Sequence, residues 1–326
     1  MIKIGTIGTS NICQNFISGM MLTGKFELAA VYSRSKENGE KFAEKYGCNK
    51  VFTSLEEMAQ WDGIDAVYIA SPNVFHFKQS KLFLMHNKHV LCEKPITTTC
   101  RDYSELKKLA DSNGCIYMEA IIPLHVKKYN EVKNALSSIG KILSARIDFS
   151  QRSSRLDSFL KGEKVNIFDM SLHAGTLMDL GVYCVYGAID LLGVPRKITS
   201  CANFLHNGAD GSGACMLDYG SYTSVLTYSK MCQGEIGSEI IGENGALRIK
   251  AISQYAGVTL IKDGNEEVIV DFPTKAELMS GEAEKFANYI LNFDEYSDNY
   301  KTVSETCLSV HKCMDEIKKI ANIRYN

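Results

Sequence analysis

Short apolar runs alternate with helical patterns over the first 120 residues, and this alternation constrains the fold more than any other feature of the chain. The apolar runs stand at 2–7, 26–32, 51–52, 66–70, 89–92 and 116–120. Helical patterns lie between several of them, for example at 12–21, 35–46 and 102–112. Strands that alternate with helices form βαβ units around a parallel sheet. We therefore expect an α/β fold that begins with a doubly wound parallel sheet.

The pattern changes after Pro123. A helical segment at 129–136 is followed by seven strand-like runs, at 142–149, 198–204, 213–219, 223–228, 235–241, 246–249 and 257–261. Turn-forming residues such as Asn207-Gly208 and Glu243-Asn244-Gly245 separate several of these runs, which is typical of hairpins. This predicts an α+β domain with a large, mostly antiparallel sheet and helices at about 170–192, 276–292 and 302–321. We place the domain boundary near residue 121, giving domains 1–121 and 122–326.

The composition excludes several classes of protein. The 326 residues are 45% hydrophobic and 23% charged, with a net charge of -2, as in ordinary soluble globular proteins. No basic excess is present for binding nucleic acid or an anionic membrane surface. The sequence shows no uninterrupted apolar run of about 18 residues and no signal peptide before the first strand. We therefore expect neither a nucleic-acid partner nor a membrane span.

The cysteines point to a reducing compartment. There are 11 of them, an odd number, and no two stand at Cys-x-x-Cys spacing. This argues against a structural zinc site and against a disulfide framework. Several stand among apolar neighbours and are expected to be small buried hydrophobes. A chain with this many free thiols is expected in the cytoplasm.

A glycine-containing turn joins the first strand to the first helix. The segment Gly5-Thr6-Ile7-Gly8-Thr9-Ser10 lacks the full G-x-G-x-x-G spacing, with Ser10 where a third glycine often stands. Glycines at such turns can serve packing alone. Inside a βαβ unit, however, the backbone N–H groups of such a loop and the following helical turn can bind a pyrophosphate. The predicted pyrophosphate-binding residues are Gly8, Thr9, Ser10, Asn11 and Ile12.

The end of the second strand bears on the choice of dinucleotide. An NAD site usually has an acidic residue there for the ribose 2′-hydroxyl. This chain has Tyr32-Ser33-Arg34-Ser35-Lys36 instead. The Ser33 hydroxyl and the Arg34 guanidinium suit a 2′-phosphate. NADP is therefore favoured over NAD, the alternative being that these residues form only a solvated first helical turn.

Two later strand ends complete the predicted cofactor site. Ser71, Pro72 and Asn73 follow the fourth strand, and we expect them and His76 to lie beside the ribose and nicotinamide, although Pro72-Asn73 is also an ordinary turn sequence. Glu93 and Lys94 follow the fifth strand, and Pro95 disfavours helix at Lys94. Ligands bind beyond the carboxyl ends of parallel strands, so Lys94 is expected to face a ligand. The alternative is a solvated Glu-Lys pair.

A second unusual segment lies in the C-terminal half. Asp179 and Tyr183 stand four residues apart in the apolar helix expected at 170–192, so they share one helical face. A carboxylate in apolar surroundings needs a partner. We expect Lys94, from the other domain, to supply it. The alternative is a core tyrosine beside an aspartate that caps a local turn.

These motifs together resemble the Gfo/Idh/MocA oxidoreductase family. The resemblance rests on the glycine turn, on Glu93-Lys94-Pro95 and on Asp179-Leu180-Gly181-Val182-Tyr183. Tyr183 in place of a histidine is similar to the branch that contains dimeric dihydrodiol dehydrogenase and glucose–fructose oxidoreductase, as is Glu119-Ala120 followed by His125. Ser10 and His173-Ala174 depart from the glycines common in this family.

The resemblance implies an N-terminal Rossmann domain and a catalytic set of Lys94, Asp179 and Tyr183. In this set Lys94 and Tyr183 contact the substrate hydroxyl and Asp179 orients them, with no metal. The expected function is hydride transfer between NADP, or NAD, and a hydroxyl or carbonyl carbon of a sugar, polyol, dihydrodiol or small dicarbonyl. A homodimer or homotetramer through the C-terminal sheet is also implied. The alternatives are a non-catalytic NAD(P)-binding sensor or scaffold and an NAD-dependent inositol or sugar dehydrogenase.

Overall fold

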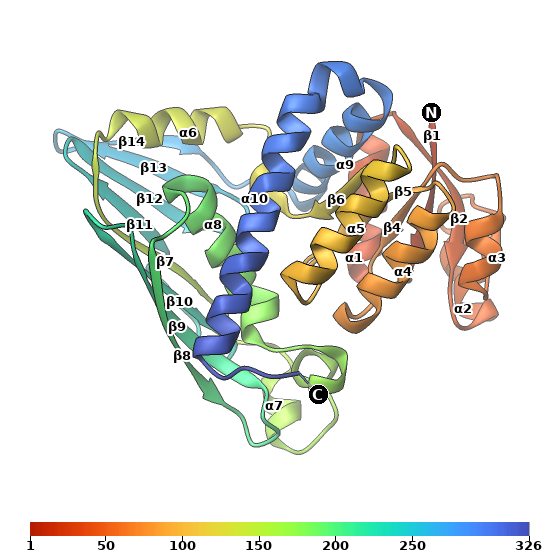
Figure 1. Ribbon diagram of the computed structural model, residues 1–326, viewed down its shortest axis with the longest axis horizontal. Coiled ribbons are helices and arrows are strands. Elements are labelled where there is room, and N and C mark those ends of the chain that lie inside the picture. The colour runs from red at the N-terminus through yellow and green to blue at the C-terminus, as the bar shows by residue number, and fades with distance from the viewer. Residues whose placement is uncertain (326) are drawn as a thin grey trace. The chain divides into compact units, whose positions relative to one another are not determined.

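The computed structural model describes residues 1–325, which form two compact units (Figure 1). Unit 1 comprises Met1–His125 and Thr274–Glu305, and unit 2 comprises Val126–Pro273 and Thr306–Asn326. Helix α9 (Lys275–Leu291) and the first part of α10 (Phe293–Ile320) thus belong with the N-terminal residues. The domain boundary near residue 121 stays a prediction.

Unit 1 contains the predicted doubly wound parallel sheet. Its six strands are all paired in parallel, in the order β3-β2-β1-β4-β5-β6. They are β1 (Ile2–Ile7), β2 (Phe26–Tyr32), β3 (Val51–Phe52), β4 (Ala66–Ile69), β5 (His89–Glu93) and β6 (Tyr117–Ala120). The winding reverses between β1 and β4, and the crevice at such a reversal is where open α/β sheets bind ligands.

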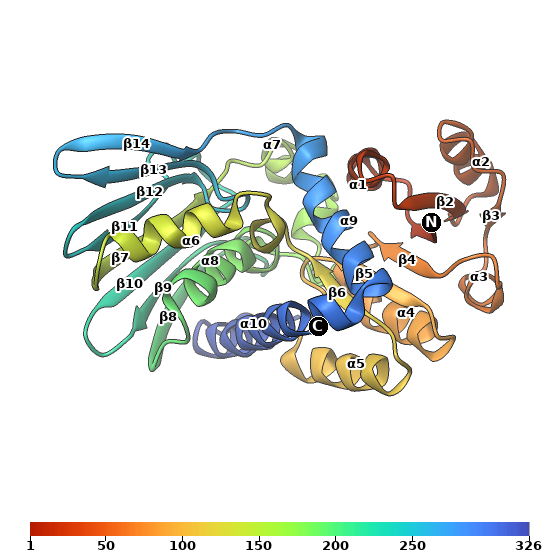
Figure 2. The same cartoon turned by 90° about the horizontal axis from the view of Figure 1, so that it is seen from above.

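Helices cover both faces of this sheet. They are α1 (Asn11–Leu22), α2 (Lys36–Glu44), α3 (Leu55–Gln60), α4 (Asn73–Met85), α5 (Cys100–Ser112) and the short 3₁₀ helix Ile122–His125. Figure 2 shows α4 and α5 on one side of the sheet and α1 with α9 on the other. Helix α9 approaches α1 closely because Gly19 has no side chain: a Cβ there would lie 2.5 Å from Cβ of Met279.

Side-chain caps fix the start of several helices. The hydroxyls of Ser35, Ser54 and Thr99 accept hydrogen bonds from the backbone N–H three residues later, at the starts of α2, α3 and α5. Thr274 and Glu277 form a complete capping box at the start of α9. These caps satisfy N–H groups that have no partner within the helix, so they explain why the helices begin where they do.

Unit 2 contains a mixed sheet of eight strands in the order β14-β13-β12-β11-β7-β10-β9-β8. The strands are β7 (Ile142–Ser150), β8 (Lys197–Phe204), β9 (Asp210–Asp218), β10 (Thr223–Ser229), β11 (Ser238–Gly242), β12 (Gly245–Ala251), β13 (Ala256–Lys262) and β14 (Asn265–Val270). The prediction of a mostly antiparallel sheet is confirmed, with one parallel pair, β7 and β10. Strand β14 was not predicted, because the first four residues of this edge strand are exposed and show no apolar alternation.

Helices pack on one face of this sheet. Figure 1 shows α6 (Tyr129–Ser138) and α8 (Val182–Leu192) along that face. The C-terminal part of α10 joins them, where the Ser200 hydroxyl of β8 donates to the carbonyl of Ile317 at 3.1 Å. Short elements precede α8, namely α7 (Leu156–Leu160), 3₁₀ turns at Asn166–Phe168 and Met170–Leu172, and a π-helical turn at Leu177–Gly181.

By length and composition alone, one helical segment of unit 2 is long and apolar enough to cross a membrane, although charged residues interrupt it. It is Met170–Leu192, with a mean hydropathy of 1.3 over its most apolar window. That window is 78% buried in the structure. Burial of this kind is also found in the core helix of a globular protein, since a helix that is apolar all round is covered on all sides.

Candidate functional site

The turn after β1 has a backbone that favours glycine. Gly8 has φ +113°, and a Cβ there would lie 3.0 Å from the carbonyl oxygen of Ala70, which follows β4. Its N–H donates to the carbonyl of Tyr32 at the end of β2. Gly5 has a different role, because a Cβ there would meet the side chain of Met58. The turn is therefore drawn tight against the two strands that flank β1.

The residues of this turn fit a pyrophosphate. Thr9 and Ile12 are half-buried and Ser10 and Asn11 are exposed at the first turn of α1. Ser10 is the N-cap residue, but its side chain makes no capping hydrogen bond. The Ser10 hydroxyl lies 3.8 Å from the sulfur of Cys13 instead. A bare helix start beside a glycine turn is the arrangement in which backbone N–H groups bind phosphate.

The two predicted 2′-phosphate residues after β2 differ in exposure. Arg34 is exposed and available to an anion. Ser33 is 8% exposed, and its hydroxyl accepts from the N–H of Ser35. Ser35 in turn caps α2. Ser33 and Ser35 therefore shape the loop, and Arg34 carries an exposed positive charge beside them.

His76 joins the loops after β4 and β5. Its imidazole is 1% exposed, with Nδ1 2.9 Å from the carbonyl oxygen of Pro95 and Nε2 2.8 Å from that of Ser71. Burial lowers the pKa of His76, which favours the neutral ring with a single donated hydrogen bond. The Ser71 hydroxyl itself donates to Gln79, and Pro72 is exposed while Asn73 is half-buried. His76 therefore holds the loops after β4 and β5 near each other, which is a structural role.

Buried groups also hold the segment around Lys94. The Glu93 carboxylate accepts from the Tyr68 hydroxyl and from the N–H of Lys94, and the Glu119 carboxylate accepts from the N–H of Ile96 at 3.1 Å. Burial raises the pKa of Glu93, and the Tyr68 hydrogen bond acts against this rise. The Lys94 side chain is half-buried. The backbone on either side of Lys94 is thus fixed by side chains from β4 and β6.

Three neighbouring strand ends consequently form one connected edge in unit 1. Gly8 after β1 lies close to Ala70 after β4, since an added Cβ would lie 3.0 Å from the Ala70 carbonyl oxygen. The His76 ring lies between the carbonyls of Ser71 and of Pro95 after β5, within 3 Å of each. All but two of the predicted cofactor residues lie on this edge. The remaining two, Ser33 and Arg34, follow the adjacent strand β2.

Unit 2 carries the other predicted site residues. Between Gly175 and Ile189, Asp179 and Tyr183 are the residues that are not buried. Asp179 lies in the π-helical turn and Tyr183 in the first turn of α8, where its ring contacts Phe149 edge-on at 5.7 Å. Asp179 and Tyr183 are therefore the partly exposed residues of this otherwise buried segment, which agrees with the spacing that places them on one helical face. Lys94 belongs to unit 1, so a site shared by all three residues stays a prediction.

The pairing of Asp179 with Lys94 stays a prediction, but unit 2 itself supplies a charged partner for Asp179, and the expected apolar surroundings of Asp179 are wrong. Asp179 is not enclosed by apolar groups: its side chain is 40% exposed. The buried member of the pair is Lys230, which is 3% exposed and places Nζ 2.7 Å from Asp179 Oδ2. Lys230 directly follows β10, and nothing in its local sequence, Ser229-Lys230-Met231, marks it as a site residue.

Asp210 was missed as well. This first residue of β9 is 1% exposed, and its carboxylate accepts from the N–H of Leu177 at 2.6 Å. Its carbonyl accepts from the hydroxyl of Thr176. A Cβ on residue 175 would lie 1.9 Å from its Oδ1, which requires the glycine found there. Asp210 thus holds the start of the helical segment that carries Asp179 and Tyr183.

His173 explains a departure from the family pattern. Its φ is 53°, in the left-handed region that glycine adopts most readily. The histidine ring stacks on Tyr325 at 5.3 Å. This contact holds the His173 side chain at a left-handed backbone position.

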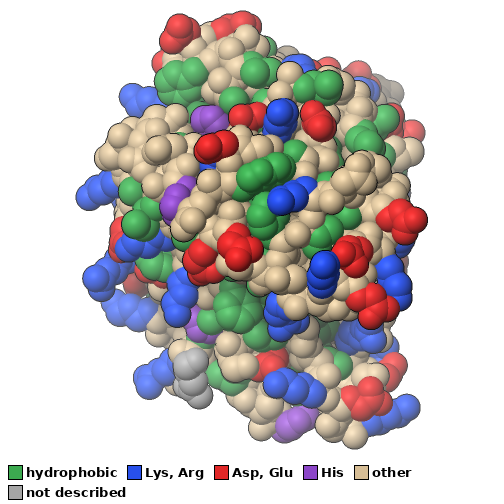
Figure 3. Space-filling view, turned by 90° about the vertical axis from the view of Figure 1, so that its right-hand side faces the viewer, with side chains coloured by type: hydrophobic (Ala, Val, Ile, Leu, Met, Phe, Trp, Pro, Cys, Tyr) green, Lys and Arg blue, Asp and Glu red, His purple; other side chains and the backbone are tan. Residues whose placement is uncertain are grey.

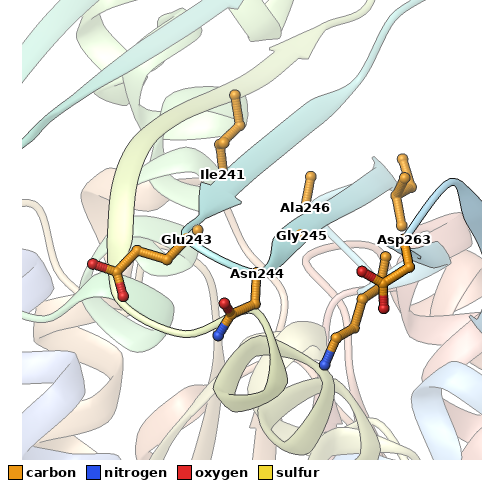
Figure 4. Close-up of a pocket in the computed structure, with 9 residues that line it drawn as sticks. Ile241, Glu243, Asn244, Gly245, Ala246 and Asp263 are labelled. Carbon is orange, nitrogen blue, oxygen red and sulfur yellow. The ribbon is translucent and has the colours of Figure 1, made fainter.

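A surface hollow in unit 2 does not coincide with these residues. It measures about 570 Å³ and is lined by the turns that join β11 to β12 and β13 to β14 (Figure 4). Gly242 of this hollow pairs with Ile142 at the start of β7, whereas Lys230 follows the β10 residue that pairs with Ser150 at the end of β7. The hollow and the ion pair therefore lie at opposite ends of β7.

Figure 3 shows the charged side chains on one face of the molecule. On the face shown in Figure 3, basic and acidic side chains are interspersed, and neither sign forms a continuous field.

Family models match both parts of the chain. Residues 2–121 match an oxidoreductase family with an NAD-binding Rossmann fold, and residues 129–248 match the GFO/IDH/MocA C-terminal domain. The chain is 37% identical over 326 residues to scyllo-inositol 2-dehydrogenase (NADP(+)) IolU of Bacillus subtilis, which covers 100% of this chain and 98% of that protein. It is 27% identical over 237 residues to the trans-1,2-dihydrobenzene-1,2-diol dehydrogenase of Mus musculus, covering 69% of each chain.

Solved structures share the fold. KijD10, a 3-ketoreductase from Actinomadura kijaniata in complex with NADP and TDP-benzene, superposes with a TM-score of 0.83 at 22% identity, covering 98% of this chain and 97% of that one. An NAD binding oxidoreductase from Klebsiella pneumoniae superposes with a TM-score of 0.82 at 19% identity, covering 98% of this chain and 96% of that one.

Proposed function

The chain belongs to the Gfo/Idh/MocA oxidoreductase family, and from this premise we propose that it is an NADP-dependent dehydrogenase that interconverts a secondary hydroxyl group and a ketone on a cyclic polyol or sugar. The observation that carries the proposal is the connected edge of unit 1, where Gly8, Ala70, His76 and Pro95 join three strand ends and Lys94 lies on the third. The cyclic polyol is chosen over other alcohols because the relative at 37% identity is an inositol dehydrogenase.

The cofactor is assigned to residues of unit 1. Backbone N–H groups from Gly8 to Ile12 hold the pyrophosphate at the start of α1, since no side chain caps that helix. Arg34, exposed after β2, pairs with the 2′-phosphate, which supports NADP over NAD. Ser71, Pro72, Asn73 and Glu93 line the nicotinamide half of the site.

The substrate oxygen is assigned to Lys94 and Tyr183. When bound, the nicotinamide supplies or accepts a hydride at the carbinol carbon. Oxidation also releases the hydroxyl proton, and reduction returns it, so a group that exchanges one proton must contact that oxygen. The Lys94 amine and the Tyr183 phenol both hydrogen-bond the oxygen, one of them exchanges the proton, and Asp179 fixes their orientation.

A non-catalytic sensor is the competing function. A Rossmann domain alone indicates binding of a nucleotide and not turnover. A sensor has no need of Lys94 on a braced strand end together with Asp179 and Tyr183 on an open helical face. These two features favour the enzyme.

Two further assignments accompany the activity. The exposed face of the unit 2 sheet is proposed to pair with a second copy of the chain, giving a homodimer or homotetramer. All 11 cysteines are free, and eight of them are buried, which fits a reducing compartment and hence the cytoplasm.

The proposed function is tested by nucleotide titration and a turnover screen. Calorimetry with NADPH and NADH should give tighter binding of NADPH, and Arg34→Ala should remove most of that difference. Wild-type protein is then assayed with NADP⁺ and scyllo-inositol, myo-inositol and aldoses, and with NADPH and the corresponding ketones. Turnover of at least one compound is expected. Binding of NADPH without turnover of any of them would favour the sensor.

A further inference from the structure

Lys230 is a buried lysine in unit 2, and burying a charged group is energetically costly. Its side chain is 3% exposed. Its Nζ lies 2.7 Å from Asp179 Oδ2, 3.3 Å from the carbonyl oxygen of Ile167 and 5.4 Å from the ring centroid of Phe168. An ammonium group removed from water is unstable unless an anion and hydrogen-bond acceptors replace the lost hydration. Here the carboxylate of a proposed site residue is that anion.

The backbone of Lys230 is fixed independently of its side chain. Its N–H donates to the carbonyl of Gly211 on β9, and its carbonyl accepts from the N–H of Ser153. The lysine therefore extends toward Asp179 from a backbone held by hydrogen bonds. Its ammonium group can then bind the Asp179 carboxylate at a defined position.

A second carboxylate, that of Asp210, contributes to the electrostatics of this pair. It holds the N–H of Leu177, two residues before Asp179, and the hydroxyl of Thr176. Burial raises the pKa of Asp210 to about 6, and the positive charge of Lys230 acts against this rise. Lys230 thus interacts electrostatically with two carboxylates: Asp179 on the open face and Asp210 beneath it.

We propose that Lys230 is a positioning residue for the proposed reaction, which anchors the Asp179 carboxylate from the buried side of the π-helical turn, with Asp210 holding the start of that turn. The proposal rests on the proposed function, since it assigns how one of its site residues is oriented. Asp179 is 40% exposed and lies in a five-residue π-turn, so its side chain has room to rotate toward solvent. The ion pair to Lys230 restricts that rotation and keeps Asp179 directed along the face that also carries Tyr183.

The test uses two substitutions at Lys230 and a control at a second lysine of unit 2. Lys230→Met keeps the length of the side chain and removes the charge, and Lys230→Arg keeps the charge. Lys133→Met is the control, because Lys133 Nζ pairs with Asp190 of α8 at 3.4 Å, away from Asp179. Each full-length variant is assayed with NADP⁺ and the cyclic polyol that wild type turns over in the screen. Melting temperature and the Kd for NADPH are measured alongside.

The expected results distinguish a role of Lys230 in positioning Asp179 from a role in protein stability alone. Lys230→Met should lower kcat at least tenfold and leave the Kd for NADPH within twofold of wild type. Lys230→Arg should recover most of kcat, and Lys133→Met should keep it within threefold. In the Asp179→Asn background, Lys230→Met should change kcat less than twofold, because the lysine acts through the aspartate.

Two outcomes would overturn the proposal and are distinguishable. If wild type turns over its substrate and Lys230→Met does so equally well, or if the effects of Lys230→Met and Asp179→Asn multiply, the positioning role is wrong and the proposed function stands. If wild type turns over nothing in the screen, the proposed function fails and the positioning role fails with it. Should Lys230→Met not fold, Lys230→Gln, which removes the charge but keeps a polar side chain, carries the same expectations.

Discussion

At the residue scale, Gly8 is the position in unit 1 where backbone conformation and close packing coincide. Its φ is positive, and a Cβ at this position would lie only 3.0 Å from the carbonyl oxygen of Ala70, so no side chain fits there without a shift of the backbone. The pyrophosphate is proposed to bind at this turn. A substitution here should therefore affect stability and nucleotide affinity together.

Gly8→Ala is expected to destabilise the protein by about 1–3 kcal/mol, the cost of a strained backbone, and to weaken NADPH binding at least tenfold. Gly24→Ala is the matched control, because Gly24 also has a positive φ of +64° but a Cβ there meets nothing within 4 Å. The control should lower the melting temperature without changing the Kd for NADPH. Calorimetric titration of both variants checks the prediction, and equal affinities in Gly8→Ala and wild type would contradict it.

The candidate site residues that the sequence suggests are those in short local motifs. Gly8, Lys94, Asp179 and Tyr183 stand next to strand ends or at helical spacing, which can be read from the chain itself. Lys230 and Asp210 could not be found in this way, because each approaches the Asp179 turn from a different strand. A lone lysine or aspartate is far more often exposed than buried.

At the scale of elements, the strands and helices of unit 1 were predictable because local signals agree with the tertiary structure. Buried strands are continuous apolar runs, and Ser54 and Thr99 stand at cap positions. The π-helical turn at Leu177–Gly181 was not predictable, since the apolar pattern of that segment is the same for an α-helix. β14 was missed because its first four residues are exposed and show no apolar alternation.

Asp210, the β9 residue that accepts from the N–H of Leu177 at the start of the π-helical turn, should give unit 2 a distinct pH dependence. Its pKa is raised from 3.8 to about 6 in the folded state. Its contribution to stability is therefore complete below about pH 4 and is lost as the pH rises through about 6, amounting to at most about 3 kcal/mol. Asp210→Asn keeps an acceptor for Leu177 and removes this titration.

The melting temperature of Asp210→Asn relative to wild type should consequently rise by several degrees between pH 4 and pH 7. Measuring both proteins at intervals across this range tests the prediction, since the other carboxyl groups titrate in both. A difference in melting temperature that stays constant with pH would show that Asp210 does not titrate as described.

At the scale of the whole molecule, the exposed sheet face of unit 2 is the surface proposed for self-association. One row across the sheet pairs Met216 with Val225, Val225 with Arg146, and Arg146 with Glu239. Met216 and Val225 are 50% and 40% exposed. Apolar side chains beside alternating charges suit a second copy of the same surface.

Val225→Arg should therefore reduce the molecular mass in solution to that of a smaller assembly, because it buries an added charge beside Arg146 in the interface. Light scattering coupled to size-exclusion chromatography measures the mass. Met85→Arg, at an exposed position at the end of α4, is the control and should leave the mass unchanged. A wild-type monomer, or a Val225→Arg protein of wild-type mass, would contradict this assignment.

The order of helices and strands along the chain does not show which of them belong to each unit. Helix α9 and the first part of α10 follow the unit 2 sheet in sequence and yet pack with unit 1. Gly19 against Met279 is one reason, and such a contact between distant segments leaves no local signal.

The proposal that Lys94 contacts the reacting oxygen is tested most directly by comparing the Kd for NADPH and kcat of Lys94→Ala with those of wild type. The lysine is proposed to contact the substrate oxygen and not the phosphates, so the Kd for NADPH should stay within about threefold of wild type. Removal of a group that binds the reacting oxygen and assists proton transfer should lower kcat by about 10²–10⁴-fold. Lys81→Ala, whose lysine pairs with Glu105 on the surface, should match wild type in both. Unchanged kcat in Lys94→Ala would contradict the account.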